Sequence, residues 1–116
     1  MDRVKQYREA IQALLKHYAN ITSRYEEIER QIIFDREHDH YQLVNLGWDG
    51  EQRIYGCVIH LDIKDEKVWI QQNMTEIELI DELGKLGVPK EDIVIGFHSP
   101  LRNVAPIKQS MSNTSN

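Results

Sequence analysis

The chain has 116 residues, of which 41% are hydrophobic and 28% charged, as expected for one globular domain with a single core. Its formal net charge is −5 and its 14 lysines and arginines are scattered, so we do not expect it to bind nucleic acid by itself. No apolar run is long enough to span a membrane and residues 1–20 are charged throughout, which indicates a cytoplasmic protein without a signal peptide. Residues 1–102 are predicted to form the domain, and residues 103–116 a flexible polar tail.

The first predicted element is an amphipathic helix over residues 2–18. Apolar side chains recur there mainly at gaps of three and four residues, as one face of a helix requires. They are Val4, Tyr7, Ile11, Leu14, Leu15 and Tyr18. Asp2 is the predicted N-cap, because its carboxylate can accept hydrogen bonds from first-turn amides. Asn20 is expected to end the helix in the left-handed conformation that asparagine tolerates.

Four strands linked by short turns are expected next, which predicts an antiparallel meander. They cover residues 28–36, 41–48, 52–63 and 68–73. Asp49-Gly50 favours a two-residue hairpin turn, since both central residues of a type I′ turn need positive φ. Asp65-Glu66 is a weaker turn signal, so we expect that loop to be longer than two residues.

Apolar side chains alternate strictly along the third strand and predict one buried face. They are Tyr55, Cys57, Ile59, Leu61 and Ile63. On this register Tyr55 lies in the core, and Tyr55→Asp would unfold the domain. Cys57 is the only cysteine, so it forms no disulfide within the chain and is expected to be a small buried hydrophobe. The other face, with Ile54, Gly56 and Val58, is half apolar and packs under a helix or against a second subunit.

The second predicted helix covers residues 73–87, where Thr75 and Glu78 have the spacing of a capping box. Gly87 is expected to supply a left-handed C-cap, and Pro89 prevents continuation. One helical turn at residues 89–92 and a short strand at residues 93–97 complete the chain. These elements predict an α+β fold with an N-terminal helix, an antiparallel sheet of four or five strands, and a second helix packed on one face.

Histidines and acids raise the question of a metal site. His60 and Asp62 share a strand face at a two-residue spacing, and metal sites do combine histidine and carboxylate ligands from strands. Asp62-Ile63-Lys64 also has the acid-x-lysine form of magnesium-dependent nucleases, with Asp35 or Asp49 as the upstream acid. A solvated strand end explains these residues more simply. The residues alone therefore assign no metal, no cofactor and no catalytic residue.

A protein-binding surface is the favoured functional interpretation, because a small antiparallel sheet with exposed edges often pairs with another chain. The candidate contact residues are Trp48, Ile54, Val58, Trp69, Gln71 and His98. The alternative, that both helices cover the half-apolar face within the monomer, stays open at this point.

Short motifs from the first strand to the end of the domain point to a family. They are Asp35-Arg36-Glu37, Asp39-His40-Tyr41, Gly47-Trp48, Tyr55-Gly56-Cys57, His60, Asp62-Ile63-Lys64, Trp69-Ile70-Gln71, Gly87-Val88-Pro89-Lys90 and Gly96-Phe97-His98-x-Pro100. Together they resemble the XisI family, the fdxN-element excision controlling factors of cyanobacteria, over residues 1 to 102. Family members usually end in an aromatic and acidic segment, whereas this chain has Asn103-Val104-Ala105-Pro106 and a polar tail.

The resemblance implies a non-enzymatic accessory factor for programmed excision of a DNA element, which acts by binding a partner protein. The implied partners are a nuclease-like companion controlling factor and a site-specific recombinase, and a homodimer is a further arrangement. No catalytic residue follows from the resemblance. Two alternatives stay open: a metal-dependent nuclease-like enzyme that uses Asp62 and Lys64, and an antitoxin-like inhibitor of a companion nuclease.

Overall fold

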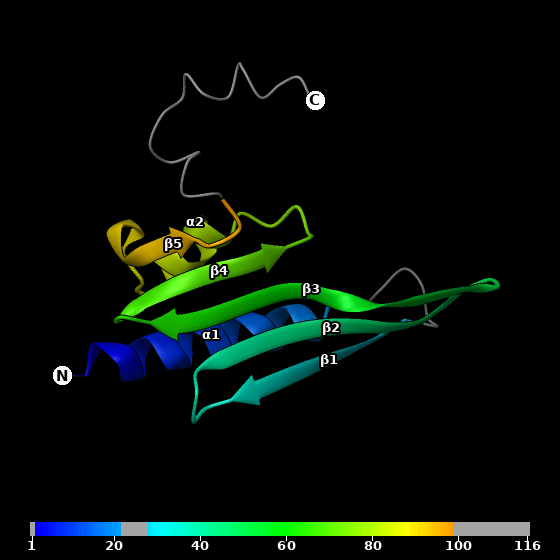
Figure 1. Ribbon diagram of the computed structural model, residues 1–116, viewed down its shortest axis with the longest axis horizontal. Coiled ribbons are helices and arrows are strands. Elements are labelled where there is room, and N and C mark those ends of the chain that lie inside the picture. Colours follow the sequence, from blue (N-terminus) through cyan, green and yellow to red (C-terminus); the bar gives the residue numbers. More distant parts are fainter. Residues whose placement is uncertain (1, 22–27, 99–116) are drawn as a thin grey trace, which may run out of the picture.

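The computed structural model describes residues 2–21 and 28–98, and its fold is α+β as predicted (Figure 1). Its elements in chain order are α1 (Arg3–Ala19), β1 (Ile28–Asp35), β2 (His40–Asp49), β3 (Gln52–Lys64), β4 (Lys67–Asn73), α2 (Leu79–Lys85), a 3₁₀ turn (Lys90–Asp92) and β5 (Ile93–Ile95). The polar tail predicted at residues 103–116 lies outside the described residues. Neither described helix is long and apolar enough to cross a membrane.

The strands form one sheet in the order β1-β2-β3-β4-β5, so neighbours in the sequence are neighbours in space. β1 to β4 form the predicted antiparallel meander. β5 is parallel to β4, because α2 connects the two strands as a crossover and returns the chain to the same end of the sheet. The sheet is therefore mixed, with one parallel edge.

The core lies between the helices and one face of the sheet. Its most completely buried side chains come from both helices, from β2, β3 and β4, and from one residue after α2, and they form a single cluster. They are Ile11, Leu15, Tyr41, Ile59, Leu61, Val68, Leu79, Leu83 and Val88. Both helices therefore pack on the same face, as Figure 1 shows, with α1 running behind β2 and β3. In the described part of the chain, nothing packs on the opposite face.

The ends of α1 lie close to their predicted positions. Asp2 is the N-cap, since its Oδ1 accepts hydrogen bonds from the amides of Val4 at 3.0 Å and Lys5 at 3.3 Å. Asn20 is the C-cap, but its φ of −91° is right-handed. The left-handed conformation expected for Asn20 is therefore wrong, because the helix ends in a turn that continues its own sense.

α2 begins at Leu79, six residues later than predicted. The Thr75 hydroxyl accepts a hydrogen bond from the Ile77 amide at 3.1 Å and donates one to Oδ1 of Asn73 at 2.6 Å. These bonds hold the chain in local turns before the helix. The predicted capping box is therefore wrong, and Glu78 takes the N-cap position without a side-chain bond to any described amide.

The C-terminal end of α2 follows the prediction. Gly87 has a φ of 103°, a region that favours glycine, and the Val88 amide donates to the carbonyl of Leu83 at 3.0 Å. This closure turns Val88 into the core, where it is fully buried. Pro89 then precedes the 3₁₀ turn instead of opening it.

A β-bulge in β3 changes which residues face the core. Leu43 pairs with Ile59, but the next residue of β2, Val44, pairs with Cys57, so Val58 is an extra residue on β3. Val58 packs against the core beside Ile59. The residues of β3 before Val58 therefore have the opposite alternation to those after it. The strict alternation read from the sequence is therefore interrupted in the middle of the strand.

Two predictions fail because of this bulge. Tyr55 is 74% exposed and lies on the face away from the helices, so its predicted place in the core is wrong, and the unfolding expected for Tyr55→Asp loses its basis. Cys57 is half-buried on that same face instead of lying in the core cluster. Its burial still raises the pKa of the thiol, which keeps the group in its unreactive protonated form.

The β2–β3 and β3–β4 hairpins each close through two residues. The β2–β3 turn consists of Gly50 and Glu51, one residue later than predicted, and of these only Gly50 has a positive φ, 65°. The β3–β4 turn consists of Asp65 and Glu66, whose φ values of 56° and 62° are those of a type I′ turn. The longer loop expected at Asp65-Glu66 is wrong, because these two residues adopt the left-handed conformation that a short hairpin needs.

Tyr7 links α1 to the turn before β5, and its ionisation at alkaline pH is expected to lower the stability of the fold. Its buried hydroxyl donates a hydrogen bond to Oδ2 of Asp92. Burial and then this bond raise the pKa of Tyr7 from 10.0 to about 12. Folding favours the neutral phenol, so its contribution is complete below pH 10.0 and is lost as the pH rises through about 12. In Tyr7→Phe, we expect urea titrations at increasing pH to show a smaller alkaline decrease in stability.

Candidate functional site

The candidate site lies on the sheet face that is not covered by a described helix, which we call the open face. Strand register and alternation place its side chains in rows across neighbouring strands. They are Glu29, Gln31, Ile33 and Asp35 of β1, His40, Gln42, Val44, Leu46 and Trp48 of β2, Arg53, Tyr55, Cys57, His60 and Asp62 of β3, and Trp69, Gln71 and Gln72 of β4. One end of the face carries the polar side chains of His40, His60 and Asp62, and the other end carries the exposed aromatic rings of Trp48 and Tyr55 next to charged side chains such as Arg53.

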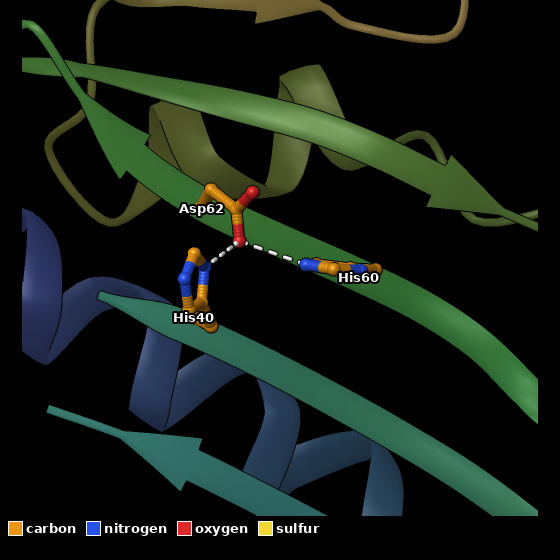
Figure 2. A group of neighbouring side chains, drawn as sticks. All are labelled: His40, His60 and Asp62. Carbon is orange, nitrogen blue, oxygen red and sulfur yellow. Dashed lines mark hydrogen bonds and ion pairs between the residues drawn. The ribbon is translucent and has the colours of Figure 1, made fainter. Parts of the chain in front are cut away.

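Asp62 is the centre of a hydrogen-bonded cluster on the polar half of this face. Its Oδ1 is 2.8 Å from Nδ1 of His40 and 2.8 Å from Nε2 of His60, and Figure 2 shows both rings directed at this one oxygen. Its Oδ2 accepts a hydrogen bond from Nε2 of Gln71 at 3.1 Å. The side-chain amide of Gln42 is 3.4 Å from Nδ1 of His60. Each side chain of the cluster thus has a partner within it.

The strand register brings these residues together. His60 and Asp62 are two residues apart on β3 and so share a face, as predicted. β2 pairs His40 with Asp62 and Gln42 with His60. A second bulge lies in β4, where Gln71 is the extra residue and its side chain reaches Asp62. The sequence predicts that His60 and Asp62 share a face. It does not predict that His40 joins them, because the predicted second strand begins at residue 41 and β2 begins at His40.

The cluster holds a charged carboxylate. The side chain of Asp62 is only 14% exposed, and this burial would raise its pKa, but the hydrogen bonds from His40 and His60 outweigh it and lower the pKa. The hydrogen bond with Asp62 raises the pKa of His40, whose side chain is 53% exposed. Two imidazole nitrogens therefore point at one anionic oxygen.

The neighbouring histidine and lysine are engaged elsewhere. Nδ1 of His38 is 2.9 Å from Oδ2 of Asp35, at the exposed end of the β1–β2 hairpin. The ammonium of Lys64 lies 4.5 Å from the centre of the Trp69 ring, and the Trp69 indole donates to the Lys64 carbonyl at 3.1 Å. Lys64 is thus held against an aromatic ring, while Asp62 is held by imidazoles.

The predicted contact residues divide between the two faces. Trp48, Trp69 and Gln71 lie on the open face, and the guanidinium of Arg53 stacks over Trp48 at 5.4 Å. Val58 packs against the core, and Ile54 points to the same side of the sheet. His98 follows β5, and its ring contacts that of Phe97 at 5.1 Å.

Sequence reasoning missed two open-face residues, Ile33 and Tyr55. They are large apolar side chains with exposed fractions of 48% and 74%. The face of Tyr55 was predicted wrongly because the bulge at Val58 reverses the alternation, and no sequence pattern indicates this bulge. Ile32 and Ile33 are adjacent isoleucines that point to opposite faces of β1, and the sequence does not show which of the two faces solvent.

Asp39 ties α1 to the turn that positions His40. Its carboxylate accepts hydrogen bonds from Arg8 at 2.7 and 3.1 Å and from the Tyr41 hydroxyl at 2.9 Å. The Arg8 bonds lower the pKa of Asp39, although burial opposes them. Asp39 has a φ of 61°, so its backbone turns sharply just before β2 begins at His40. The network fixes the start of the strand that brings His40 to Asp62.

Comparison with known proteins agrees with the fold and the motifs. Residues 1–105 match the model of the XisI protein family. The crystal structure of a XisI-like protein from Anabaena variabilis ATCC 29413 is 46% identical, with a TM-score of 0.79 over 85% of this chain and 91% of that one. The fdxN element excision controlling factor XisI from the same organism is 31% identical, with a TM-score of 0.74 over 87% and 98% of the two chains. A search of curated proteins gave no match. With a family match over nearly the whole chain and two structures of the same architecture, this protein belongs to the XisI family.

Proposed function

We propose that this chain is a non-enzymatic accessory factor for programmed excision of a DNA element, and that it acts by binding a partner protein through the open face. Family membership and the 31% identity to an fdxN element excision controlling factor support a role in excision control. The observation that supports partner binding is the exposure of large apolar side chains on the open face. Ile33 and Trp48 are each 48% exposed and Tyr55 is 74% exposed. Burial of such surface against a partner is favourable.

The charge of the chain favours a protein partner that itself binds DNA. The chain has 19 acidic residues against 14 lysines and arginines, a poor composition for contacts with phosphates. A nuclease-like companion controlling factor must carry a cationic surface for its DNA. A chain with a net charge of −5 attracts such a surface and speeds the encounter. The companion factor is therefore the partner that we propose, in preference to DNA or a second copy of this chain.

Size-exclusion chromatography with light scattering tests this proposal, on the chain alone and after co-expression with the protein encoded beside it. We expect a stable complex of defined stoichiometry. A homodimer that excludes the neighbour would show that the open face binds a second copy instead. The absence of any complex would contradict partner binding.

Variants of the open face should separate binding from folding. Trp48→Asp and Tyr55→Asp are each expected to weaken the complex by at least about tenfold, because a charge would be buried in the apolar centre of the interface. Both should leave the melting temperature of the free chain nearly unchanged, since the side chains are exposed. Leu86→Asp is the matched control, because Leu86 is 45% exposed on the helix side. If Leu86→Asp weakens the complex and the other two do not, the interface lies on the helices.

A DNA cleavage assay distinguishes the proposed accessory factor from the metal-dependent nuclease alternative. Incubation of the purified chain with DNA and Mg²⁺ should give no cleavage. Cleavage that is lost in Asp62→Asn would instead favour a nuclease that uses Asp62 and Lys64. If the neighbour is a nuclease whose activity falls on adding this chain, the antitoxin-like alternative is favoured.

A further inference from the structure

We propose that His40, His60 and Asp62 bind a divalent transition-metal ion on the open face. They offer Nδ1, Nε2 and Oδ1 respectively, and ligand atoms of the three side chains lie within 4.8 Å of one another. Two imidazole nitrogens and one carboxylate oxygen suit Zn²⁺, Co²⁺ or Ni²⁺. Mg²⁺ and Ca²⁺ prefer sites made mostly of oxygen atoms, and this cluster offers one carboxylate. The proposal therefore concerns an ion of the zinc type.

The distances fit a four-coordinate ion after a small movement of the side chains. Zinc bonds of about 2.1 Å at tetrahedral angles separate the ligand atoms by roughly 3.4 Å. Both imidazole nitrogens are now 2.8 Å from the Asp62 oxygen, as hydrogen bonds require. Each nitrogen must therefore move about half an ångström farther from that oxygen, and both rings must turn from the oxygen toward an ion placed between the three ligand atoms. The His40 side chain is 53% exposed, so it is free to shift, and the fourth position is open to water.

Metal binding also requires a lone pair on each imidazole nitrogen. In the metal-free cluster both nitrogens carry a proton, because the Asp62 oxygen that they contact is an acceptor. The ion takes the place of these two protons, which move to the other ring nitrogen or leave to water. Nδ1 of His60 already has the Gln42 amide at 3.4 Å, and its oxygen accepts Nδ1–H once the amide has turned. This partner supports the tautomer of His60 that binds metal.

Gln71 orients the carboxylate, and Gly96 makes room for Gln71. The Gln71 amide donates to Oδ2 of Asp62 at 3.1 Å, which leaves Oδ1 directed at the two histidines. A Cβ atom on Gly96 would collide with Oε1 of Gln71. Gly96 is held in place by its own amide, which donates to the Ile70 carbonyl at 2.8 Å. Gly96 is therefore a positioning residue for the site.

Metal titrations of the full chain, after treatment with a chelator and dialysis, test the proposal. We expect ZnCl₂ and CoCl₂ to raise the melting temperature and MgCl₂ to leave it unchanged. The increase should persist in His38→Ala, a matched control that removes the neighbouring histidine of the β1–β2 hairpin. It should be lost in His40→Ala and in His60→Ala, and the visible absorption of bound Co²⁺ should be lost with it. The histidines lie on the open face, so the metal-free variants should fold, which circular dichroism checks.

Gly96→Ala tests the positioning role without removing a ligand. Pushing Gln71 away from Asp62 should raise the dissociation constant for Zn²⁺ by about 10–100-fold, as loss of such supporting bonds usually does. Gly84→Ala is the control, because a Cβ atom there meets nothing within 4 Å. Isothermal titration calorimetry gives both constants.

Two outcomes would overturn the proposal. One is the absence of any response to Zn²⁺, Co²⁺ or Ni²⁺. The other is a response that survives both His40→Ala and His60→Ala, which would place the ion elsewhere. Partner binding is measured separately, so either result leaves the proposed function untouched.

Discussion

Ile59→Ala is expected to lower the free energy of unfolding by about 2–5 kcal/mol, because it removes a fully buried side chain from the centre of the core. Ile59 is the residue at which β3 resumes its inward alternation after the bulge. Helices and sheet enclose the side chain, so the cavity left by the substitution can collapse only partly. Urea denaturation of the two proteins measures the difference.

Tyr55→Ala is the matched control for this substitution, on the same strand and of similar apolar character. Tyr55 is 74% exposed, so we expect a change of no more than about 0.5 kcal/mol. A larger loss of stability for Tyr55→Ala than for Ile59→Ala would show that the bulge at Val58 does not exist and that the strand alternates without interruption.

Asp39→Ala should also destabilise the fold, by about 1–3 kcal/mol, chiefly because it removes the carboxylate that accepts the hydrogen bond of the buried Tyr41 hydroxyl. Tyr41 is fully buried, and its hydroxyl bonds to Asp39 at 2.9 Å. The substitution also releases Arg8, which joins α1 to the hairpin through two hydrogen bonds. Removal of one member of such a network costs more than removal of both ends of a bond.

Two further variants make this expectation specific. In Tyr41→Phe/Asp39→Ala no hydroxyl is left unpaired, so this double variant should recover part of the stability lost in Asp39→Ala. Asp35→Ala, in the same hairpin, removes a carboxylate whose partners are the exposed His38 ring and the exposed amides of Glu37 and His38, and should cost less than Asp39→Ala. Equal losses for Asp35→Ala and Asp39→Ala would show that the network with α1 adds nothing to stability.

The sequence predicts most of the fold because its periodicities are local. The helix at residues 2–18 follows from the spacing of Ile11, Leu14 and Leu15, and these side chains are buried as predicted. The meander follows from short turns between apolar runs. The short length of α2 could not be predicted, because Asn73 and Thr75 bind local amides and compete with the helix.

The candidate site was only half predictable for a similar reason. His60 and Asp62 share a face by simple alternation along one strand. His40 joins them through pairing between strands, and its place depends on where the β1–β2 turn ends. The bulges at Val58 and Gln71 each involve one extra residue relative to the neighbouring strand. A single sequence does not reveal which strand will pair in which register.

The bulge at Val58 has a consequence for how this family can diversify. Deletion of Val58 would leave Cys57 beside Ile59 with every other residue of β3 on its present face, since the extra residue alone is removed. The strand would lose the additional twist that a bulge imposes, so the β2–β3 hairpin with Trp48 and Tyr55 would point in a new direction. The direction of this hairpin can thus change by gain or loss of one codon, and the side chains on its surface can change independently by substitution.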